Sequence, residues 1–250
     1  MTMNPHRLID YFQKLIFSLY FSGILCLIIL VFIGACAKHS VQKSLVTPAT
    51  YEKIDTIEQR AYQAMAAGDY QTGIRLYERI IEKDPSNALA YYYLGYAYGQ
   101  TGNRSKEVLY YEKSISLGYK TDQIFHNLGE AYLELGQIDE SIQAFKQGLA
   151  INSKSADNHF GLAKALQETL NYDRAEEELL KTIRLEPKVI EFREFLGLFY
   201  VERGDLHKAA EQFEQILEID PDHEGARAFL EQIVKGGTLE KKGIPGMGGD

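Results

Sequence analysis

Hydrophobic and polar residues follow two different patterns along the 250-residue chain. Residues 15–37 form a nearly unbroken apolar run without a charged residue, and the chain becomes polar and charged after Lys38. Beyond residue 53, apolar, small and turn-forming residues recur at fixed intervals. Intervals of this length are typical of stacked helical hairpins. The pattern therefore predicts an apolar N-terminal segment followed by an all-α body.

Three residue classes independently mark a 34-residue period. The glycines on this grid, interrupted only by Leu170, are Gly68, Gly102, Gly136 and Gly204. The prolines on the same grid are Pro85, Pro187 and Pro221. The large apolar series is Tyr77, Tyr111, Phe145, Leu179 and Phe213. We expect glycine to close the first helix of each hairpin, proline to end the second, and the apolar series to fill the wedge between neighbours. Leu170 in place of glycine, and Tyr119 and Ser153 in place of proline, predict looser turns in repeats two to four.

Together with the pairs Leu94-Gly95 and Leu128-Gly129, this grid resembles the tetratricopeptide repeat family. The resemblance implies a right-handed superhelical solenoid of five helix-turn-helix repeats that span 54–223. The individual repeats are predicted at 54–87, 88–121, 122–155, 156–189 and 190–223. The remaining body is interpreted as a capping helix at 224–235 and a disordered, glycine-rich tail at 236–250.

The N-terminal 35 residues are typical of an export signal. Arg7 and Lys14 precede the apolar run, which ends in Ile33-Gly34-Ala35-Cys36. This ending resembles a bacterial lipobox, so residues 1–35 are predicted to be a lipoprotein signal peptide, Cys36 the lipidation site, and 36–53 a polar tether. The alternative is an uncleaved transmembrane anchor, since the run is long enough to span a bilayer. The charges on either side of the run do not settle the orientation of such an anchor, whereas lipidation of Cys36 places the body outside the cytoplasm. The chain is therefore expected to be membrane-attached and outside the cytoplasm. Ala37 resembles the pattern for outer-membrane sorting, so an outer-membrane lipoprotein is favoured and an inner-membrane anchor is the alternative.

Candidate binding residues come from the resemblance, because family members hold peptides or partner helices on a concave face built by the first helix of each repeat. The positions carried over are Glu58, Tyr62, Tyr92, Tyr96, His126, Glu130, Glu134, Phe160, Lys164, Glu194 and Leu198. The full set of groove positions holds nine carboxylates and one lysine. It predicts binding of a basic or amphipathic protein segment. The alternative is that these are solvated helix faces without a ligand.

Catalytic chemistry is not predicted. No thiol follows Cys36, and no metalloprotease, nucleophile-elbow or phosphate-loop motif is present. His126 is expected to face the groove and His159 the core, so no metal site, cofactor or small-molecule substrate is predicted. The net charge of −8 argues against nucleic acid as a partner.

The sequence predicts a membrane-tethered scaffold or assembly factor of the bacterial envelope that binds other proteins. The alternative is an inner-membrane-anchored, chaperone-like or quality-control module. A third possibility is self-association, in which the groove takes up the tail of another copy.

Overall fold

The structure is a computed structural model that describes residues 53–235. The predicted signal segment, Cys36, most of the tether and the predicted tail lie outside the described residues. Within the described part every element is a helix, which confirms the all-α prediction. The helices are α2 (Ile54–Ala66), α3 (Tyr70–Lys83), α4 (Ala88–Gln100), α5 (Arg104–Ser116), α6 (Asp122–Glu134), α7 (Ile138–Ile151), α8 (Ala156–Glu168), α9 (Tyr172–Leu185), α10 (Ile190–Glu202), α11 (Leu206–Ile219) and α12 (Glu224–Lys235).

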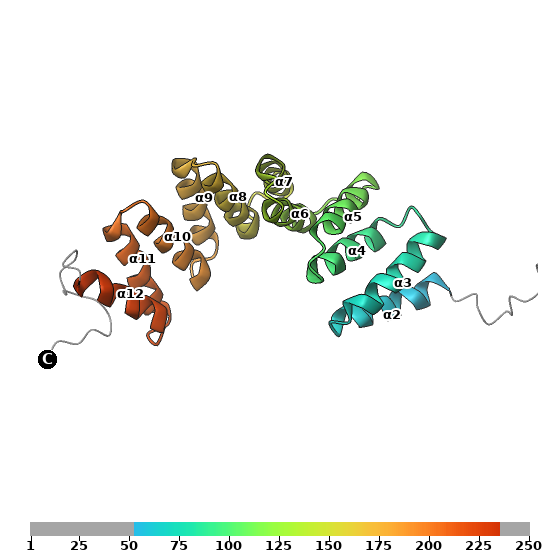
Figure 1. Ribbon diagram of the computed structural model, residues 1–250, viewed down its shortest axis with the longest axis horizontal. Coiled ribbons are helices and arrows are strands. Elements are labelled where there is room, and N and C mark those ends of the chain that lie inside the picture. The colour runs from blue at the N-terminus through green and yellow to red at the C-terminus, as the bar shows by residue number, and fades with distance from the viewer. Residues whose placement is uncertain (1–52, 236–250) are drawn as a thin grey trace, which may run out of the picture. The chain divides into compact units, whose positions relative to one another are not determined.

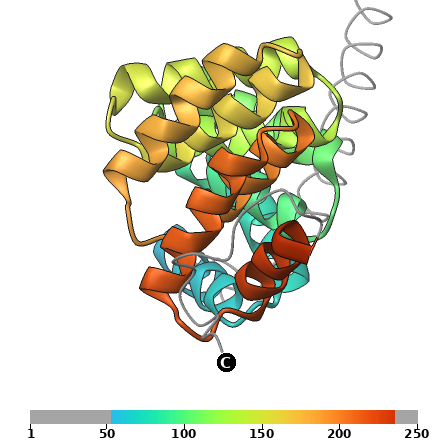
Figure 2. The same cartoon turned by 90° about the vertical axis from the view of Figure 1, so that its left-hand side faces the viewer.

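Consecutive helices pair as hairpins, and consecutive hairpins pack side by side. The first helices α2, α4, α6, α8 and α10 each pack against the following second helix, and each second helix packs against the next first helix. Figure 1 shows the hairpins following one another in chain order. Seen from the C-terminal side in Figure 2, the hairpin axes turn from one repeat to the next, so the array coils.

Most of these helices begin at a polar side chain that accepts a backbone N–H of the first turn. The residues that do so are Asp69, Asn87, Asn103, Thr121, Ser155 and Asp205. Each cap satisfies an N–H that has no partner within its helix, which stabilises the helix by about 1 kcal/mol. These caps fix where the helices that carry them start, and α7, α9 and α10 begin without a side-chain cap.

The turn inside every hairpin has the same backbone geometry. Gly102 has a φ of 78°, and Leu170, on the same grid, has a φ of 58°. In the first of these turns Asn103 N–H donates to Tyr98 O, and in the second Asn171 N–H donates to Leu166 O at a matching distance of 2.8–2.9 Å. The expectation of a looser turn at Leu170 is therefore wrong, because the chain holds the same left-handed turn with a leucine.

Replacing Leu170 with glycine is expected to stabilise the protein by about 1 kcal/mol. A leucine in the left-handed region is strained, and its side chain is 70% exposed, so little packing is lost. Urea unfolding followed by circular dichroism measures the change. Gly102→Ala, which creates the same strain in another turn, should destabilise. A destabilised Leu170→Gly variant would mean that the leucine contributes packing that outweighs its strain.

The close approach between helices is made by glycine facing an aromatic ring. A Cβ on Gly95 would lie 2.6 Å from the ring of Tyr111, and one on Gly197 would lie 2.7 Å from the ring of Phe213. The predicted wedge residues are therefore core residues, and the hairpins approach closely because the facing positions carry no side chain.

Candidate functional site

All eleven predicted groove residues lie on first helices and keep at least partial exposure. The most open are Tyr62 on α2, which is 59% exposed, and Leu198 on α10, which is 57% exposed. The others are half-buried, apart from Glu134, which is exposed. The first helices thus present these side chains at the surface, although their binding role stays a prediction.

Ion pairs neutralise part of the predicted acidic face. Lys164 on α8 donates to Glu130 on α6 at 2.7 Å. Arg104, the first residue of α5, pairs with Glu134, and His223 Nε2 lies 3.4 Å from Glu194. Arg104 therefore adds a cation from outside the first helices to the nine carboxylates and one lysine of the groove positions, and His223 adds a contact to Glu194. Sequence reasoning missed both because it considered first-helix positions only.

The aromatic residues of the predicted groove are mostly packed against one another. The Tyr92 ring lies 5.8 Å from the ring of Tyr111 and 5.2 Å from that of Tyr119, and burial raises the pKa of Tyr92 to about 12. Phe160 packs 4.9 Å from Phe192, between α8 and α10. These two side chains therefore hold neighbouring repeats together, which limits what they can offer a partner.

Tyr96 and His126 are also engaged within the fold. The Tyr96 ring contacts the ring of Tyr70 at 6.3 Å, and burial raises the pKa of Tyr96. The His126 ring lies 5.9 Å from the ring of Phe145, and its Nδ1 is buried without a hydrogen-bond partner. Tyr62 thus remains the one strongly exposed aromatic among the predicted groove residues.

Tyr62 borders a hollow of about 390 Å³ between the first two repeats, which we term the Tyr62 hollow. Its lining comes from α2, α3 and α4 and comprises Asp55, Glu58, Gln59, Tyr62, Tyr77, Leu89, Ala90 and Tyr93. Glu58 accepts a hydrogen bond from Asn87 Nδ2 at 2.9 Å. Two carboxylates beside tyrosine faces are suited to a cationic side chain with an apolar stem, because ring faces and carboxylates both attract cations.

The two histidines considered for metal binding lie in different surroundings. His159 Nδ1 lies 2.5 Å from Glu178 Oε2, and its Nε2 lies 3.1 Å from Ser153 O. Both ring nitrogens of His159 therefore already have partners, one on α9 and one in the connection before α8. Between residues 53 and 235 no cluster of three histidine, cysteine or acidic side chains has the arrangement of a metal site.

The described helices carry no membrane span. None of the helices from α2 to α12 combines the length and the apolar composition that a membrane span requires. The apolar run at 15–37 and the lipidation site Cys36 fall outside the described residues, so both stay predictions.

Two family models match the repeat region. One, described as a tetratricopeptide repeat, matches residues 59–118 and 160–224, and a second, described as a TPR repeat, matches 129–169. The chain belongs to the tetratricopeptide repeat family. A comparison with curated protein sequences finds no match.

Solved structures of the family share the fold. MamA from Desulfovibrio magneticus RS-1, solved from residue 41 to its end, is 18% identical, with a TM-score of 0.65 over 69% of this chain and 98% of its own. TTC0263 from Thermus thermophilus is 21% identical, with a TM-score of 0.56 over 73% of this chain and all of its own.

A third similar structure is YrrB, described as a TPR protein with an unusual peptide-binding site. It is 20% identical, with a TM-score of 0.62 over 73% of this chain and 94% of its own. In all three cases nearly a whole solved chain corresponds to the repeat region here. In these three structures a chain of about this extent has the fold with little additional sequence.

Proposed function

We propose that this chain is a protein-binding scaffold that holds a basic or amphipathic segment of another protein on its first-helix face. The observation that carries the proposal is the Tyr62 hollow, where an exposed ring adjoins two carboxylates. The peptide-binding site named for the similar protein YrrB supports it by analogy of fold. Asp55, which lines the hollow, is exposed and therefore accessible to a partner.

We expect only some of the groove positions to act as anchors. Glu130 and Glu134 are paired with Lys164 and Arg104, so an incoming cation would have to displace those partners. Surface pairs of this kind contribute little net energy, so exchanging one cation for another gains little. Binding energy is therefore expected to concentrate at the Tyr62 hollow, with Leu198 offering a separate apolar contact in repeat five.

The proposal includes attachment to the bacterial envelope through a lipid on Cys36. The lipobox-like Ile33-Gly34-Ala35-Cys36 sequence supports it, and Ala37 favours delivery to the outer membrane. A scaffold or assembly factor held there by residues 36–53 would present its first-helix face to envelope partners. Retention of an uncleaved helix at 15–37 would instead favour the alternative, an inner-membrane-anchored chaperone-like module.

Substitution of Tyr62 by alanine together with Asp55→Lys is expected to abolish capture of the partner. The first change removes the ring, and the second places a cation where the partner's cation would lie. The measurement is a crosslinking pull-down from envelope extract with a fragment of residues 51–250 as bait. The matched control is Leu180→Ala with Glu211→Lys. It also truncates one large apolar side chain to alanine and changes one acid to lysine, but on α9 and α11. A partner captured equally by all three proteins would place binding away from the Tyr62 hollow.

A further inference from the structure

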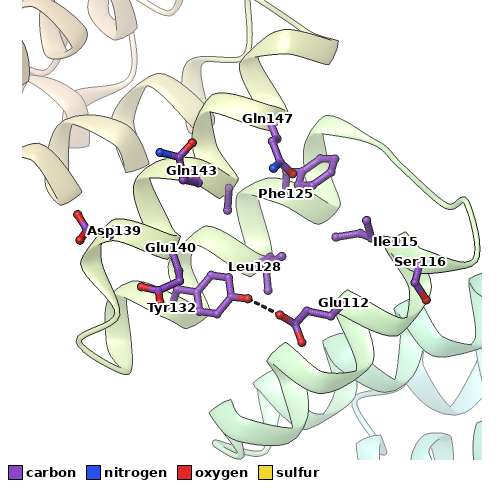
Figure 3. A pocket seen from close by; sticks show the side chains of 11 residues that line it. Glu112, Ile115, Ser116, Phe125, Leu128, Tyr132, Asp139, Glu140, Gln143 and Gln147 are labelled. Atoms are coloured by element: carbon purple, nitrogen blue, oxygen red, sulfur yellow. Dashed lines mark hydrogen bonds between the residues drawn. The ribbon is translucent and has the colours of Figure 1, made fainter.

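A second hollow, of about 540 Å³, lies where repeats two and three meet. We term it the Glu112 hollow. Figure 3 shows its floor, formed by Phe125 and Leu128 of α6, between walls from α5 and α7. Glu112 stands on the α5 wall, and Asp139 and Glu140 stand on the α7 wall. An apolar floor is thus bordered by carboxylates on both sides.

The connection between repeats two and three differs from the others described. Five residues, 117–121, connect α5 to α6, whereas four connect each of the other repeats to the next helix. Gly118 has a φ of 99°, and Tyr119 N–H donates to Ser114 O at 3.1 Å, which is the bonding of a turn inside a hairpin. Proline stands after α3, α9 and α11 instead. The longer connection, closed by Gly118, therefore joins the two repeats between which the Glu112 hollow lies.

The Glu112 hollow faces away from the predicted groove. Its floor residues Phe125, Leu128 and Tyr132 recur on one side of α6. The groove positions His126 and Glu130 are turned by roughly half the helix circumference from them, at about 100° per residue. The two hollows therefore lie on different faces, and a ligand in one does not compete directly with a ligand in the other.

The charge of the Glu112 hollow specifies its ligand. No lysine, arginine or histidine is among its lining residues. Glu112 accepts a hydrogen bond from the Tyr132 hydroxyl at 2.6 Å, and Asp139 and Glu140 are exposed. Three carboxylates around an apolar floor are complementary to lysine side chains next to an aliphatic residue.

The chain carries a segment with paired lysines. Lys241-Lys242 is the only pair of adjacent basic residues formed by lysine or arginine in the sequence. Glu240 and Gly243 flank it directly, and Leu239 and Ile244 lie one residue further out. The α7 wall from Asp139 to Gln147 is about 12 Å long, at about 1.5 Å per residue. Four extended residues span about 13 Å. The stretch from Leu239 to Lys242 therefore fits the hollow in length, and its net charge of +1 (two lysines and Glu240) is opposite to that of the hollow.

We propose that the Glu112 hollow binds the segment 239–244 of a second copy of this chain. Leu239 would occupy the apolar floor, and Lys241 and Lys242 would pair with the carboxylates on the walls. Donor and acceptor are different surfaces, so the contact is head-to-tail and leaves each copy with a free hollow or a free segment for the next. This assembly does not depend on the proposed groove function, and it leaves the Tyr62 hollow open.

The direct test uses a fluorescein-labelled peptide of residues 236–250 and a protein fragment of residues 51–235. Fluorescence anisotropy should report saturable binding in low salt that weakens as salt screens the ion pairs. The variant Glu112→Gln, Asp139→Asn, Glu140→Gln should bind at least about tenfold more weakly. Gln143→Trp, which fills the hollow without changing charge, should weaken binding as well.

The matched control neutralises three carboxylates elsewhere, Glu186→Gln, Glu211→Gln and Glu218→Gln, and should bind the peptide as the unsubstituted fragment does. If both triple variants bound the peptide equally weakly, the binding would depend only on the net charge of the fragment, and the proposal would be overturned. Undiminished binding to the Gln143→Trp fragment would overturn it too, because the peptide would then lie elsewhere. In the fragment 51–250, light scattering should show association that Lys241→Glu with Lys242→Glu removes, and a monomer at all concentrations would contradict self-assembly.

Discussion

Replacing Phe145 with alanine is expected to lower the free energy of unfolding by about 3–5 kcal/mol. The ring is fully buried. It lies between two glycines of successive first helices: a Cβ on Gly129 would lie 2.6 Å from it, and one on Gly161 would lie 2.2 Å from it. Since glycine leaves no side chain that could move into the space, truncation of the ring leaves a cavity that the surroundings cannot refill.

Phe145→Ala should also make the two halves of the repeat array unfold separately. In a stack of repeats, stability is the sum of repeat terms and of interfaces between neighbours. Phe145 on α7 belongs to the interface of repeats three and four, so its loss weakens the coupling between the N-terminal and C-terminal parts. Urea unfolding of the fragment 51–250 should show two transitions where the unsubstituted fragment shows one.

Leu198→Ala provides the control for this loss, because that leucine is also apolar but more than half exposed. Its removal should change the free energy of unfolding by no more than about 0.5 kcal/mol. A change below about 1 kcal/mol for Phe145→Ala would show that neighbouring side chains repack into the space, contrary to the constraint set by the two glycines.

The 34-residue grid predicted the repeats because periodic contacts repeat with the sequence. Tyr111, Phe145 and Phe213 face Gly95, Gly129 and Gly197 in turn, as the grid requires. The left-handed turn of repeat four follows the grid even though Leu170 occupies it. In these places local backbone geometry is dictated by packing common to all repeats, and a single unsuitable residue does not change it.

Contacts that break the repeat could not be predicted in this way. Arg104 reaches Glu134 across the junction of repeats two and three, and the grid positions of this pair carry Ile138 with Glu168 and Tyr172 with Glu202 in the next two repeats. Gly118 has no counterpart on the glycine grid, yet it closes α5. Gly161 faces Phe145 from the next hairpin. Each depends on the angle between particular hairpins, and one sequence does not specify that angle.

The second large effect on the free energy of unfolding is expected from a buried acidic residue on α5, Glu107. Glu107 on α5 is only 6% exposed, although repeats four and five carry Ala175 and Ala209 at its position. Gly99 makes room for it, since a Cβ there would lie 2.4 Å from Glu107 Oε1. Arg104 Nη1 donates to Glu107 Oε2 at 2.7 Å. Burial raises the pKa of Glu107, and Arg104 opposes that shift.

Replacing Arg104 with leucine is therefore expected to cost about 3 kcal/mol near neutral pH. The substitution leaves a carboxylate among buried groups without its cation. A carboxyl whose pKa is raised in the folded state binds its proton more tightly when folded, so the loss is full above the folded pKa and shrinks as the pH falls toward the unfolded value. Urea unfolding at about pH 7.5 and about pH 4.5 compares the full loss with the reduced one.

Two further variants separate the charge of Arg104 from its other contacts. Glu134→Gln removes only the pair with a half-exposed carboxylate, and should cost less than about 0.5 kcal/mol. Arg104→Leu with Glu107→Gln removes the buried charge and should recover most of the loss at neutral pH, because the amide needs no cation. An equal loss of stability on Arg104→Leu at both pH values would contradict this account. Arg104 would then act through the packing of its aliphatic stem and its hydrogen bond to Gly99 O, and Glu107 would tolerate burial without a cation.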